Sequence, residues 1–392
     1  MIIPISNPAL QNTLLAPELL DATQNVIRSG EYILGQHVKR FEMAFSMYTG
    51  AKHCLGVNSG TDALYLALRA CGVEAGHEVI VPAMTFVATA EAVARTGAWP
   101  VFCDIQNDGR DLIDIDKMKE LITERTKAII VVHLHGYVCE MTEIMDIAAD
   151  HNIAVIEDCA QATGASTIIG DKRYYAGTMG HVGCFSFFPT KNLGAIGDGG
   201  CIITNEDEVA KEVEMLRQHG GAKNNPKYIG ENSRLDGLQA AYLTIKLDFL
   251  DEWNASRKAI AQRYQENFLN LDRNSKTFNL MFPKSGYPSI LMAPLDDDCV
   301  YHHYSMTVPT YMRNDLVSYL HNKNIGAMVY YPHMIPAIEA YQKYGRADCK
   351  NAFYQSQSTI SLPMYPELTK KEVQYIVQWF AAGVEELALS DD

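Results

Sequence analysis

One lysine of the chain has an unusual setting. Lys191 lies in the stretch FSFFPTKNLGAIGDGG (residues 185–200), between an apolar segment and a glycine-rich loop. Lysine is rarely buried without a partner, and loss of solvent lowers its pKa, so that the neutral amine becomes a nucleophile toward carbonyl groups. Lys191 is therefore a candidate Schiff-base lysine. The stretch is equally compatible with a surface lysine at the start of a loop.

A second feature, NSGTDAL (residues 58–64), joins the end of an apolar run to the start of a helical pattern. Ser59, Gly60 and Thr61 would offer backbone N–H groups and hydroxyls to an anion such as a phosphate, and the helix dipole would add attraction. The alternative is an ordinary N-cap formed by Ser59 or Thr61.

A third feature, EDCAQATGA (residues 157–165), overlaps the end of the apolar run IAVIE, and ligands of open α/β sheets bind where strands end. Asp158 would keep a pyridine nitrogen protonated, and Gln161 would hydrogen-bond another ring substituent. The alternative is a capping aspartate and a solvated glutamine. A phosphate loop, an acidic residue and a lysine, in that order, are what pyridoxal phosphate (PLP) requires, so together they predict a PLP site.

These three features need a sheet to bring them together. Short apolar runs alternate with helical patterns between about residues 50 and 205, and the expected strands are 53–57, 78–81, 100–105, 128–134, 153–157, 184–188 and 201–204. In the helical stretch 61–71, Leu64, Leu68 and Cys71 share one face. The alternation predicts an α/β fold with a seven-stranded, mainly parallel sheet covered by helices on both faces. The last strand could run antiparallel.

A long helical pattern follows the region of the sheet, and the composition changes beyond it. Residues 238–268 have a helical pattern without Pro or Gly, which predicts a connecting helix or a bent helix pair. Further strands are expected within 301–309 and 327–331, and helices around 315–323 and 370–386. We therefore predict a large domain over residues 1–245, which includes the N-terminal segment, and a smaller α+β domain over residues 246–392.

Composition narrows the functional classes. The chain of 392 residues is 47% hydrophobic and 20% charged, which is typical of a globular protein. Its formal net charge of −14 argues against broad binding to nucleic acid or anionic membranes. The nine cysteines form no C-x-x-C pair, and such scattered cysteines are typical of a protein in a reducing compartment. With no signal-peptide pattern and no run of about 18 apolar residues, we expect a cytoplasmic protein.

Five segments carry a family resemblance: GVNSGTDAL, PAMTFVATA, EDCAQATGA, FSFFPTKNLGAIGDGG and NSRLDGLQAAYL. Their order and wording closely resemble the DegT/StrS family of PLP-dependent sugar aminotransferases, and the resemblance extends from SGEYILG (29–35) to SLPMYPEL (361–368). It implies the aspartate-aminotransferase fold (PLP fold type I) and a homodimer with active sites at the subunit interface.

The resemblance also implies a role for individual residues. Lys191 would carry the cofactor, and Asp158 would pair with its pyridine nitrogen. The other expected cofactor contacts are Gln161 near the ring hydroxyl, Phe86 stacked on the ring, Gly60, Thr61 and Ser186 at the phosphate, and Asn232 reaching the phosphate from the neighbouring subunit. From the residues alone, Phe86 would be a core aromatic and Asn232 a turn residue.

The implied reaction is a ping-pong transamination in which L-glutamate gives its amino group and leaves as 2-oxoglutarate, after which a keto- or aldehydo-sugar receives it. Lys191 would act as the general base and acid. Relatives with histidine at this position deoxygenate sugars instead, so Lys191 favours transamination.

The acceptor is expected to be a nucleotide-linked keto-6-deoxyhexose, as in most relatives. Two segments depart from the family pattern, YYPHMIPAIEAY (330–341) and RYYAGTMGHVG (173–183). They leave open a non-nucleotide acceptor such as 8-oxo-3-deoxy-manno-octulosonate. Candidate substrate contacts are His181, His219, His302, His303 and Tyr331, although a histidine in such a setting more often has a structural role.

Other functional classes fit the sequence less well. The glycine cluster GAIGDGG (194–200) lacks the G-x-G-x-x-G spacing of a dinucleotide-binding loop. His133 and His135 form an i, i+2 pair, and without a recurring ligand spacing no metal is predicted. A PLP-binding sensor without catalytic activity remains an alternative, since this family includes members discussed as sensors.

Overall fold

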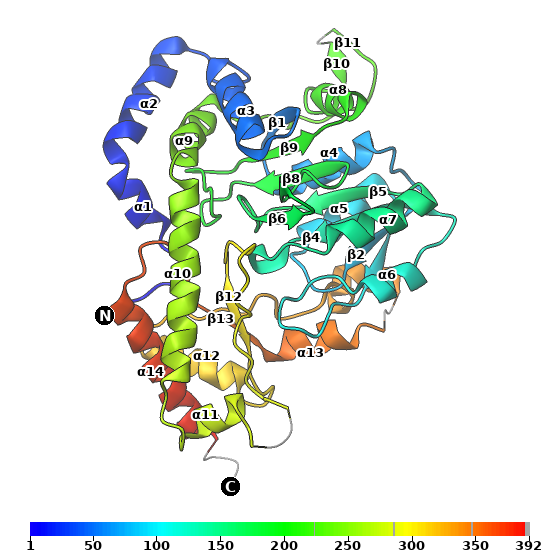
Figure 1. Ribbon diagram of the computed structural model, residues 1–392. Coiled ribbons are helices and arrows are strands. Elements are labelled where there is room, and N and C mark those ends of the chain that lie inside the picture. Colours follow the sequence, from blue (N-terminus) through cyan, green and yellow to red (C-terminus); the bar gives the residue numbers. More distant parts are fainter. Residues whose placement is uncertain (223, 285–286, 346–347, 389–392) are drawn as a thin grey trace.

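A seven-stranded sheet forms the centre of the computed structural model, which describes residues 1–222, 224–284, 287–345 and 348–388 (Figure 1). The strand order is β1-β9-β8-β5-β4-β2-β3. The strands are β1 (His53–Val57), β2 (Glu78–Pro82), β3 (Trp99–Cys103), β4 (Thr126–Val132), β5 (Ala154–Asp158), β8 (Val182–Ser186) and β9 (Gly200–Thr204). Every strand predicted for this sheet is present within two residues of its expected ends.

Strand direction decides which loops meet. Strands β3, β2, β4, β5 and β8 are parallel, whereas β9 runs antiparallel to both β8 and β1. The carboxyl ends of β1, β2, β4, β5 and β8 therefore lie along one edge of the sheet. That edge is where open α/β sheets bind their ligands.

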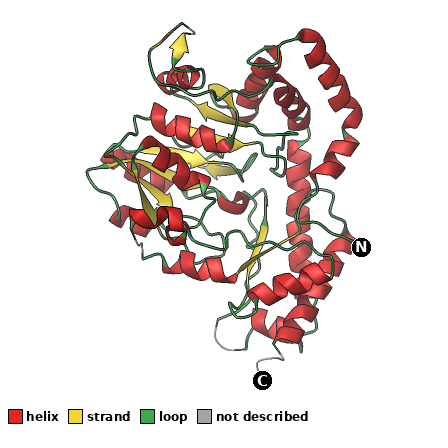
Figure 2. Cartoon of the chain, turned by 180° about the vertical axis from the view of Figure 1, so that it is seen from behind, coloured by secondary structure: helices red, strands yellow, loops and turns green. Residues whose placement is uncertain are grey.

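Helices cover both faces of the sheet, as Figures 1 and 2 show from opposite sides. Along β8 the side chains alternate between two cores: Cys184 belongs to the core that contains α4 (Gly60–Ala70) and α5 (Ala88–Thr96), and Phe185 to the core that contains α3 (Gln36–Thr49) and α9 (Gly237–Leu247). The Phe45 and Phe185 rings meet edge to face with centroids 5.0 Å apart. This alternation is the period-2 pattern of a strand buried on both sides.

The remaining elements near the sheet are short. They are α6 (Ile115–Glu120), η1 (Leu134–Gly136), α7 (Met141–His151), α8 (Asp207–Leu216), and two-stranded pairs β6 (Ser166–Ile169) with β7 (Lys172–Tyr175) and β10 (Gly221–Ala222) with β11 (Asn225–Pro226). The β6–β7 hairpin was not predicted, although Gly170 at its turn has φ +62°, a conformation that favours glycine.

The predicted helical stretch after residue 237 is a bent pair. Helix α9 ends at Leu247, and α10 (Leu250–Leu269) begins after two intervening residues and runs toward the C-terminal elements (Figure 1). There α10 packs on α14 (Lys370–Leu387) through an edge-to-face contact between Phe268 and Phe380, with ring centroids 5.3 Å apart.

The C-terminal elements are helical around a small antiparallel sheet. They comprise α11 (Lys276–Met281), β12 (Tyr304–Thr307), α12 (Arg313–Asn322), η2 (Ile335–Ala337), η3 (Glu339–Tyr344), α13 (Lys350–Ser358), β13 (Thr359–Leu362) and α14. The strand expected over 327–331 is wrong: only Met328 forms a bridge, to Ser361. The partner of β12 is instead β13, and Tyr330 and Tyr331 line a cavity.

The first residues of the chain lie with these C-terminal elements. The N–H of Ile3 donates to the Asn324 carbonyl at 2.9 Å, and the N–H of Met364 donates to the Ile5 carbonyl at 3.0 Å. Only then do α1 (Pro8–Leu14) and α2 (Ala16–Ser29) lead the chain back to α9. The division into domains at residues 245 and 246 stays a prediction.

The start of α14 provides a first test of local stability. The Thr369 hydroxyl accepts a hydrogen bond from the N–H of Glu372 at 3.3 Å, and the Glu372 carboxylate accepts one from the N–H of Thr369 at 2.8 Å, which is a capping box. We expect Thr369→Ala to lower the free energy of unfolding by about 1 kcal/mol, measured by urea denaturation. Thr369→Ser keeps the hydroxyl, so its loss in free energy of unfolding should be well below that of Thr369→Ala. An equal loss in both variants would contradict the capping role.

Candidate active site

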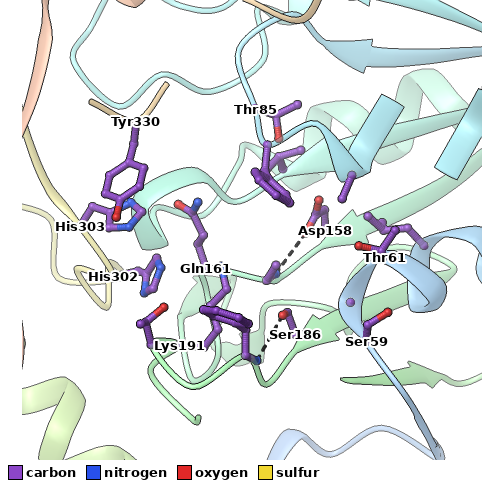
Figure 3. A pocket seen from close by; sticks show the side chains of 18 of the residues that line it. Ser59, Thr61, Thr85, Asp158, Gln161, Ser186, Lys191, His302, His303 and Tyr330 are labelled. Atoms are coloured by element: carbon purple, nitrogen blue, oxygen red, sulfur yellow. Dashed lines mark hydrogen bonds between the residues drawn. The ribbon is translucent and has the colours of Figure 1, made fainter. Parts of the chain in front are cut away.

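The main cavity opens at the carboxyl edge of the sheet and has a volume of about 400 Å³. In Figure 3, Thr61, Ser59, Ser186 and Asp158 lie on one side of it, and His302, His303 and Tyr330 lie opposite. Ten of the predicted site residues line this cavity: Gly60, Thr61, Phe86, Asp158, Gln161, Ser186, Lys191, His302, His303 and Tyr331.

Lys191 lies in the loop that follows β8, where its N–H donates to the Phe188 carbonyl at 2.8 Å. Burial lowers the pKa of its ammonium group to about 8, and the charge of Asp158 partly opposes this shift. Within the described ranges its Nζ makes no hydrogen bond and no ion pair. Lys191 thus has a reactive amine facing open space, as a Schiff-base lysine requires.

Three side chains from α9 and α10 hold the loop that carries Lys191. The Asn192 amide donates to the Asn254 side-chain oxygen at 2.8 Å, and Lys246 Nζ donates to the Gly194 carbonyl at 2.7 Å. The Gln239 side chain accepts a hydrogen bond from the N–H of Ile196 at 2.9 Å. Because these anchors come from distant helices, no spacing pattern in the sequence indicates them.

Asp158 is the last residue of β5 and is buried. One carboxylate oxygen accepts from the N–H of Ala160 at 3.1 Å, and the other accepts from the Thr89 hydroxyl at 3.0 Å. Since the single Thr89 proton points at Asp158, the Thr85 hydroxyl must donate to Thr89 Oγ1 over 3.0 Å. Burial raises the pKa of Asp158, while these hydrogen bonds oppose the rise. A cation beside Asp158 would favour its ionised form.

Gln161 has a fixed amide orientation. Its Oε1 accepts from the N–H of His135 at 2.7 Å, so its Nε2 is the group that donates to the Tyr331 hydroxyl, at 3.0 Å. The Tyr331 hydroxyl keeps its own proton for a ligand, since burial raises the pKa of this phenol. Phe86, a residue that is 53% exposed, lies beside Tyr331 with ring centroids 5.9 Å apart.

The N-terminus of α4 forms a narrow cradle. Ser59 caps the helix by accepting from the N–H of Asp62 at 3.1 Å. A side chain at Gly60 would bring its Cβ within 2.6 Å of Ser186 Cβ, and one at Gly200 would lie 2.5 Å from the Ser59 carbonyl carbon. The helix start therefore packs directly against β8 and β9, with its N–H groups, Thr61 and Ser186 at the cavity, which suits a phosphate group.

Three predicted residues do not reach this cavity. His181 accepts a hydrogen bond from the N–H of Val155 at 2.9 Å, near the amino end of β5 and about 10 Å along the strand from Asp158. It lines a separate groove with Lys127 and Glu206, so the structure gives no support for a substrate contact there. His219 and Asn232 lie on the segment after α8, where the N–H of His219 donates to Glu231 and Asn232 is exposed.

A buried cluster below the cavity combines potential metal ligands. The atoms of His133, Glu157 and Cys159 lie within 4.8 Å of one another. Glu157 accepts hydrogen bonds from His133 Nε2 at 2.9 Å and from the N–H groups of Gly177 and Met179, and His133 Nδ1 accepts from the N–H of Cys139. These bonds use the ligand atoms of both residues, so the cluster fixes the strand ends beneath the site.

Several lining residues were not predicted. Thr85, Asp198 and Tyr330 face the cavity, and Thr89 supports Asp158 from behind. Thr85 and Thr89 both lie in the PAMTFVATA segment, so their spacing of four residues at a helix start was an available signal.

In the described part of the chain, no helix is long and apolar enough to cross a bilayer.

The residues present fit PLP. A cradle for phosphate, a buried carboxylate, an exposed aromatic ring and an unpaired lysine of lowered pKa surround one cavity, and the strand order places them at one edge of the sheet. The fold and the site together define a PLP-dependent enzyme of fold type I.

Comparison with known proteins specifies the family. A model of the DegT/DnrJ/EryC1/StrS aminotransferase family matches residues 14–381, and the chain belongs to this family. It is 39% identical to a pleiotropic regulatory protein of Geobacillus stearothermophilus (97% of this chain, 98% of the relative). It is also 39% identical to the dTDP-3-amino-3,6-dideoxy-α-D-galactopyranose transaminase of Aneurinibacillus thermoaerophilus (96% and 98%).

Solved structures agree with this assignment. DesV of S. venezuelae, in complex with a ketimine intermediate, matches with a TM-score of 0.87 and 33% identity over 99% of this chain and 98% of that one. Spr1654 of Streptococcus pneumoniae in its PMP form matches with a TM-score of 0.87 and 27% identity over all of both chains. The predicted family, fold type, enzyme class and cofactor are confirmed: the chain is a PLP-dependent sugar aminotransferase.

The pKa of Lys191 gives a testable pH dependence. Only the neutral amine attacks an aldehyde, so capture of PLP by the cofactor-free protein should speed up as pH rises through about 8 and then level off. The charge of Asp158 raises this pKa, so Asp158→Asn should move the midpoint lower. Stopped-flow absorbance measures the rate. Asp198→Asn removes another carboxylate of the same cavity and serves as the control; an equal shift in both variants would contradict the assignment.

Proposed function

We propose that this enzyme transfers the amino group of L-glutamate to a nucleotide-linked keto-6-deoxyhexose, with release of 2-oxoglutarate. The observation that carries the proposal is the unpaired amine of Lys191 beside the buried Asp158 at the ligand edge of the sheet. The Aneurinibacillus relative is named as a transaminase for a dTDP-linked amino sugar, which supports a nucleotide-linked acceptor over an octulosonate.

Each lining residue would have one task. When bound, PLP supplies an aldehyde that condenses with amines and a ring that withdraws electrons from them. The α4 N-terminus, Thr61 and Ser186 would hold the phosphate. Asp158, kept in place by Ala160 and Thr89, would face the pyridine nitrogen, and Gln161 would donate to the ring hydroxyl.

Lys191 would then move the proton that transamination requires. With a pKa near 8, its Nζ exchanges protons at neutral pH in both directions. It would take the proton from the α-carbon of the donor and return it to the cofactor, and in the second half-reaction it would act in the reverse order. Its neighbours leave the Nζ unbonded, so it can reach both positions.

The proposal includes a homodimer with active sites at the subunit interface. Phe86, Phe188 and Ile196 are 53%, 51% and 44% exposed around the cavity and its loop, and Ile229 near Asn232 is 87% exposed. Apolar side chains exposed in this way are typical of an interface. Asn232 does not line the cavity of its own chain, so we propose that it completes the phosphate site of the partner subunit.

The donor half-reaction can be followed by visible absorbance. L-Glutamate should convert the PLP form of the wild-type protein to the pyridoxamine form, and Lys191→Ala should slow this conversion by about 10²–10⁴-fold, the usual contribution of a general acid–base group. Lys52→Ala, a lysine exposed on the surface, is the matched control and should behave as wild type. If glutamate leaves the wild-type spectrum unchanged, a PLP-binding regulator, as the name of the Geobacillus relative suggests, becomes the better hypothesis.

A mixture of two inactive variants tests the role of Asn232. We expect Lys191→Ala and Asn232→Ala homodimers both to be impaired, and a refolded equimolar mixture to regain about a quarter of wild-type activity. Half of the dimers are then hybrids, and each hybrid combines one intact lysine with one intact asparagine at the same site. Activity is measured as glutamate-driven turnover, and the mixture would regain none if Asn232 served its own subunit. Sedimentation velocity shows whether the protein forms dimers.

A further inference from the structure

A chain of buried polar side chains leads from α13 to the wall of the cavity. The Gln355 amide donates to Asp111 Oδ2 at 3.1 Å, and His135 Nε2 lies 3.3 Å from the same oxygen. On the other side of its ring, His135 Nδ1 lies 3.3 Å from His303 Nδ1. Asp111 and His135 are buried, whereas His303 lines the cavity. The resemblance to the family does not account for this connection.

The hydrogen bonds assign the protons of His135. Gln355 Oε1 accepts from the Thr307 hydroxyl at 3.2 Å, so its Nε2 must be the donor to Asp111. A carboxylate only accepts, and therefore His135 Nε2 carries a proton that it donates to Asp111. A neutral imidazole then has a bare Nδ1, which accepts hydrogen bonds.

The assignment passes from His135 to His303. Two bare nitrogens 3.3 Å apart would repel each other, so His303 Nδ1 must carry the proton of their shared hydrogen bond. Ser305 Oγ, 3.4 Å from His135 Nδ1, can donate to the same atom without changing this result. Burial, together with the charge of Lys191, holds the pKa of His303 well below its usual range, so its Nε2 is unprotonated.

His302 also has a protonated Nδ1 and an unprotonated Nε2, and here the assignment comes from Asn192. Asn192 uses its Nδ2 to donate to Asn254 and Val300, so its oxygen accepts from His302 Nδ1 at 3.0 Å. His302 Nε2 is then bare. Within the described residues neither His302 Nε2 nor His303 Nε2 has a hydrogen-bond partner, and neither is among the atoms sealed from solvent. The rings lie side by side with centroids 4.1 Å apart (Figure 3).

We propose that Asp111 and His135 are positioning residues that hold His303 as its Nδ1–H tautomer, so that His303 and His302 together present two hydrogen-bond acceptors to hydroxyl or amide N–H groups of the acceptor sugar. The identity of the ligand as a sugar rests on the function proposed above, whereas the tautomer does not. Tyr330 stacks on His303 at 3.9 Å between centroids and 10° between planes, and so fixes the plane of the ring.

The pair of acceptors selects a class of ligand. Hydroxyl and N–H groups of a sugar can donate to bare imidazole nitrogens, whereas a carboxylate or phosphate oxygen placed there would face lone pairs without a proton between them. The two histidines therefore discriminate by hydrogen-bond polarity. L-Glutamate carries two carboxylates and gains nothing from these nitrogens, so the donor half-reaction should not depend on them.

The first experiment reads the tautomer directly in the full-length PLP-bound protein. Long-range ¹H–¹⁵N correlation spectra of protein labelled with ¹⁵N-histidine distinguish the two nitrogens of each ring, and the signal lost in His303→Phe identifies His303. We expect Nδ1–H in the wild type. His135→Phe removes the connection and should release the tautomer. A protonated Nε2 on His303 in the wild type would overturn the proposal.

A matched pair of variants separates the effect of the Asp111–His135 hydrogen bond from a general effect on folding. Asp111 has φ +61°, which Gly and Asn both tolerate. Asp111→Asn keeps an oxygen acceptor for His135 Nε2 and should keep the tautomer, whereas Asp111→Gly should lose it. If both variants, or neither, lose the tautomer, Asp111 does not set it. The wild-type spectrum tests the proposal even if Asp111→Gly fails to fold.

The second experiment compares the two half-reactions. With dTDP-3-amino-3,6-dideoxy-α-D-galactopyranose as the amino-sugar probe, His135→Phe and His303→Phe should raise KM by about tenfold, as expected for one lost hydrogen bond, with a smaller change in kcat. The glutamate half-reaction should stay unchanged. The control His151→Gln, an exposed histidine on α7, should alter neither.

The outcomes separate this inference from the function on which it rests. Equal losses in both half-reactions would mean a general structural role and would overturn the proposal. A wild-type protein that does not react with glutamate would instead refute the proposed function. In that case the His303 tautomer, read on the same sample, still supports or overturns the roles of Asp111 and His135.

Discussion

The Lys191 amine and the Asp158 carboxylate face one cavity that shields both from bulk water, and neither is paired directly with the other. Burial lowers the pKa of Lys191 and raises that of Asp158, while each charge opposes the shift of the other. Either group alone would tend to become neutral. The rest of the site maintains this balance: Thr89 and Ala160 hold the carboxylate, and α9 and α10 hold the loop of Lys191 through Asn254, Lys246 and Gln239.

That arrangement depends on close packing at the carboxyl edge of the sheet. Gly60 and Gly200 let the start of α4 approach β8 and β9 more closely than any side chain would allow, and this approach brings the helix N–H groups to the same cavity as Lys191. One side of the cavity thus offers hydrogen-bond donors to an anion. The position of β9 between β1 and β8 also explains why the phosphate segment and the lysine loop, far apart in sequence, are neighbours.

The opposite side of the cavity has the reverse polarity. His302 and His303 are held neutral, each with a hydrogen-bonded Nδ1 and an open Nε2, and Tyr331 keeps a proton to donate. A phosphate-bearing cofactor and a hydroxyl-bearing sugar would therefore meet complementary surfaces in one space. The side chains that impose this polarity, Asp111, His135 and Asn192, do not contact the ligand region themselves. They act by fixing protons, and fixed protons decide what a buried site can bind.

Local patterns in the sequence were enough to predict the seven strands, the helix start near residue 60, and the three segments whose residue types suit PLP. These follow from periodicity and from the chemistry of neighbouring residues, which need no knowledge of distant contacts. Other features are set by long-range contacts of the folded chain: Thr89 supports Asp158, His181 lies near the amino end of β5, β12 pairs with β13, and Asp111 reaches His303 through His135. Each of these depends on residues tens to hundreds of positions apart, and hydrogen bonds across such distances leave no spacing pattern in a single sequence.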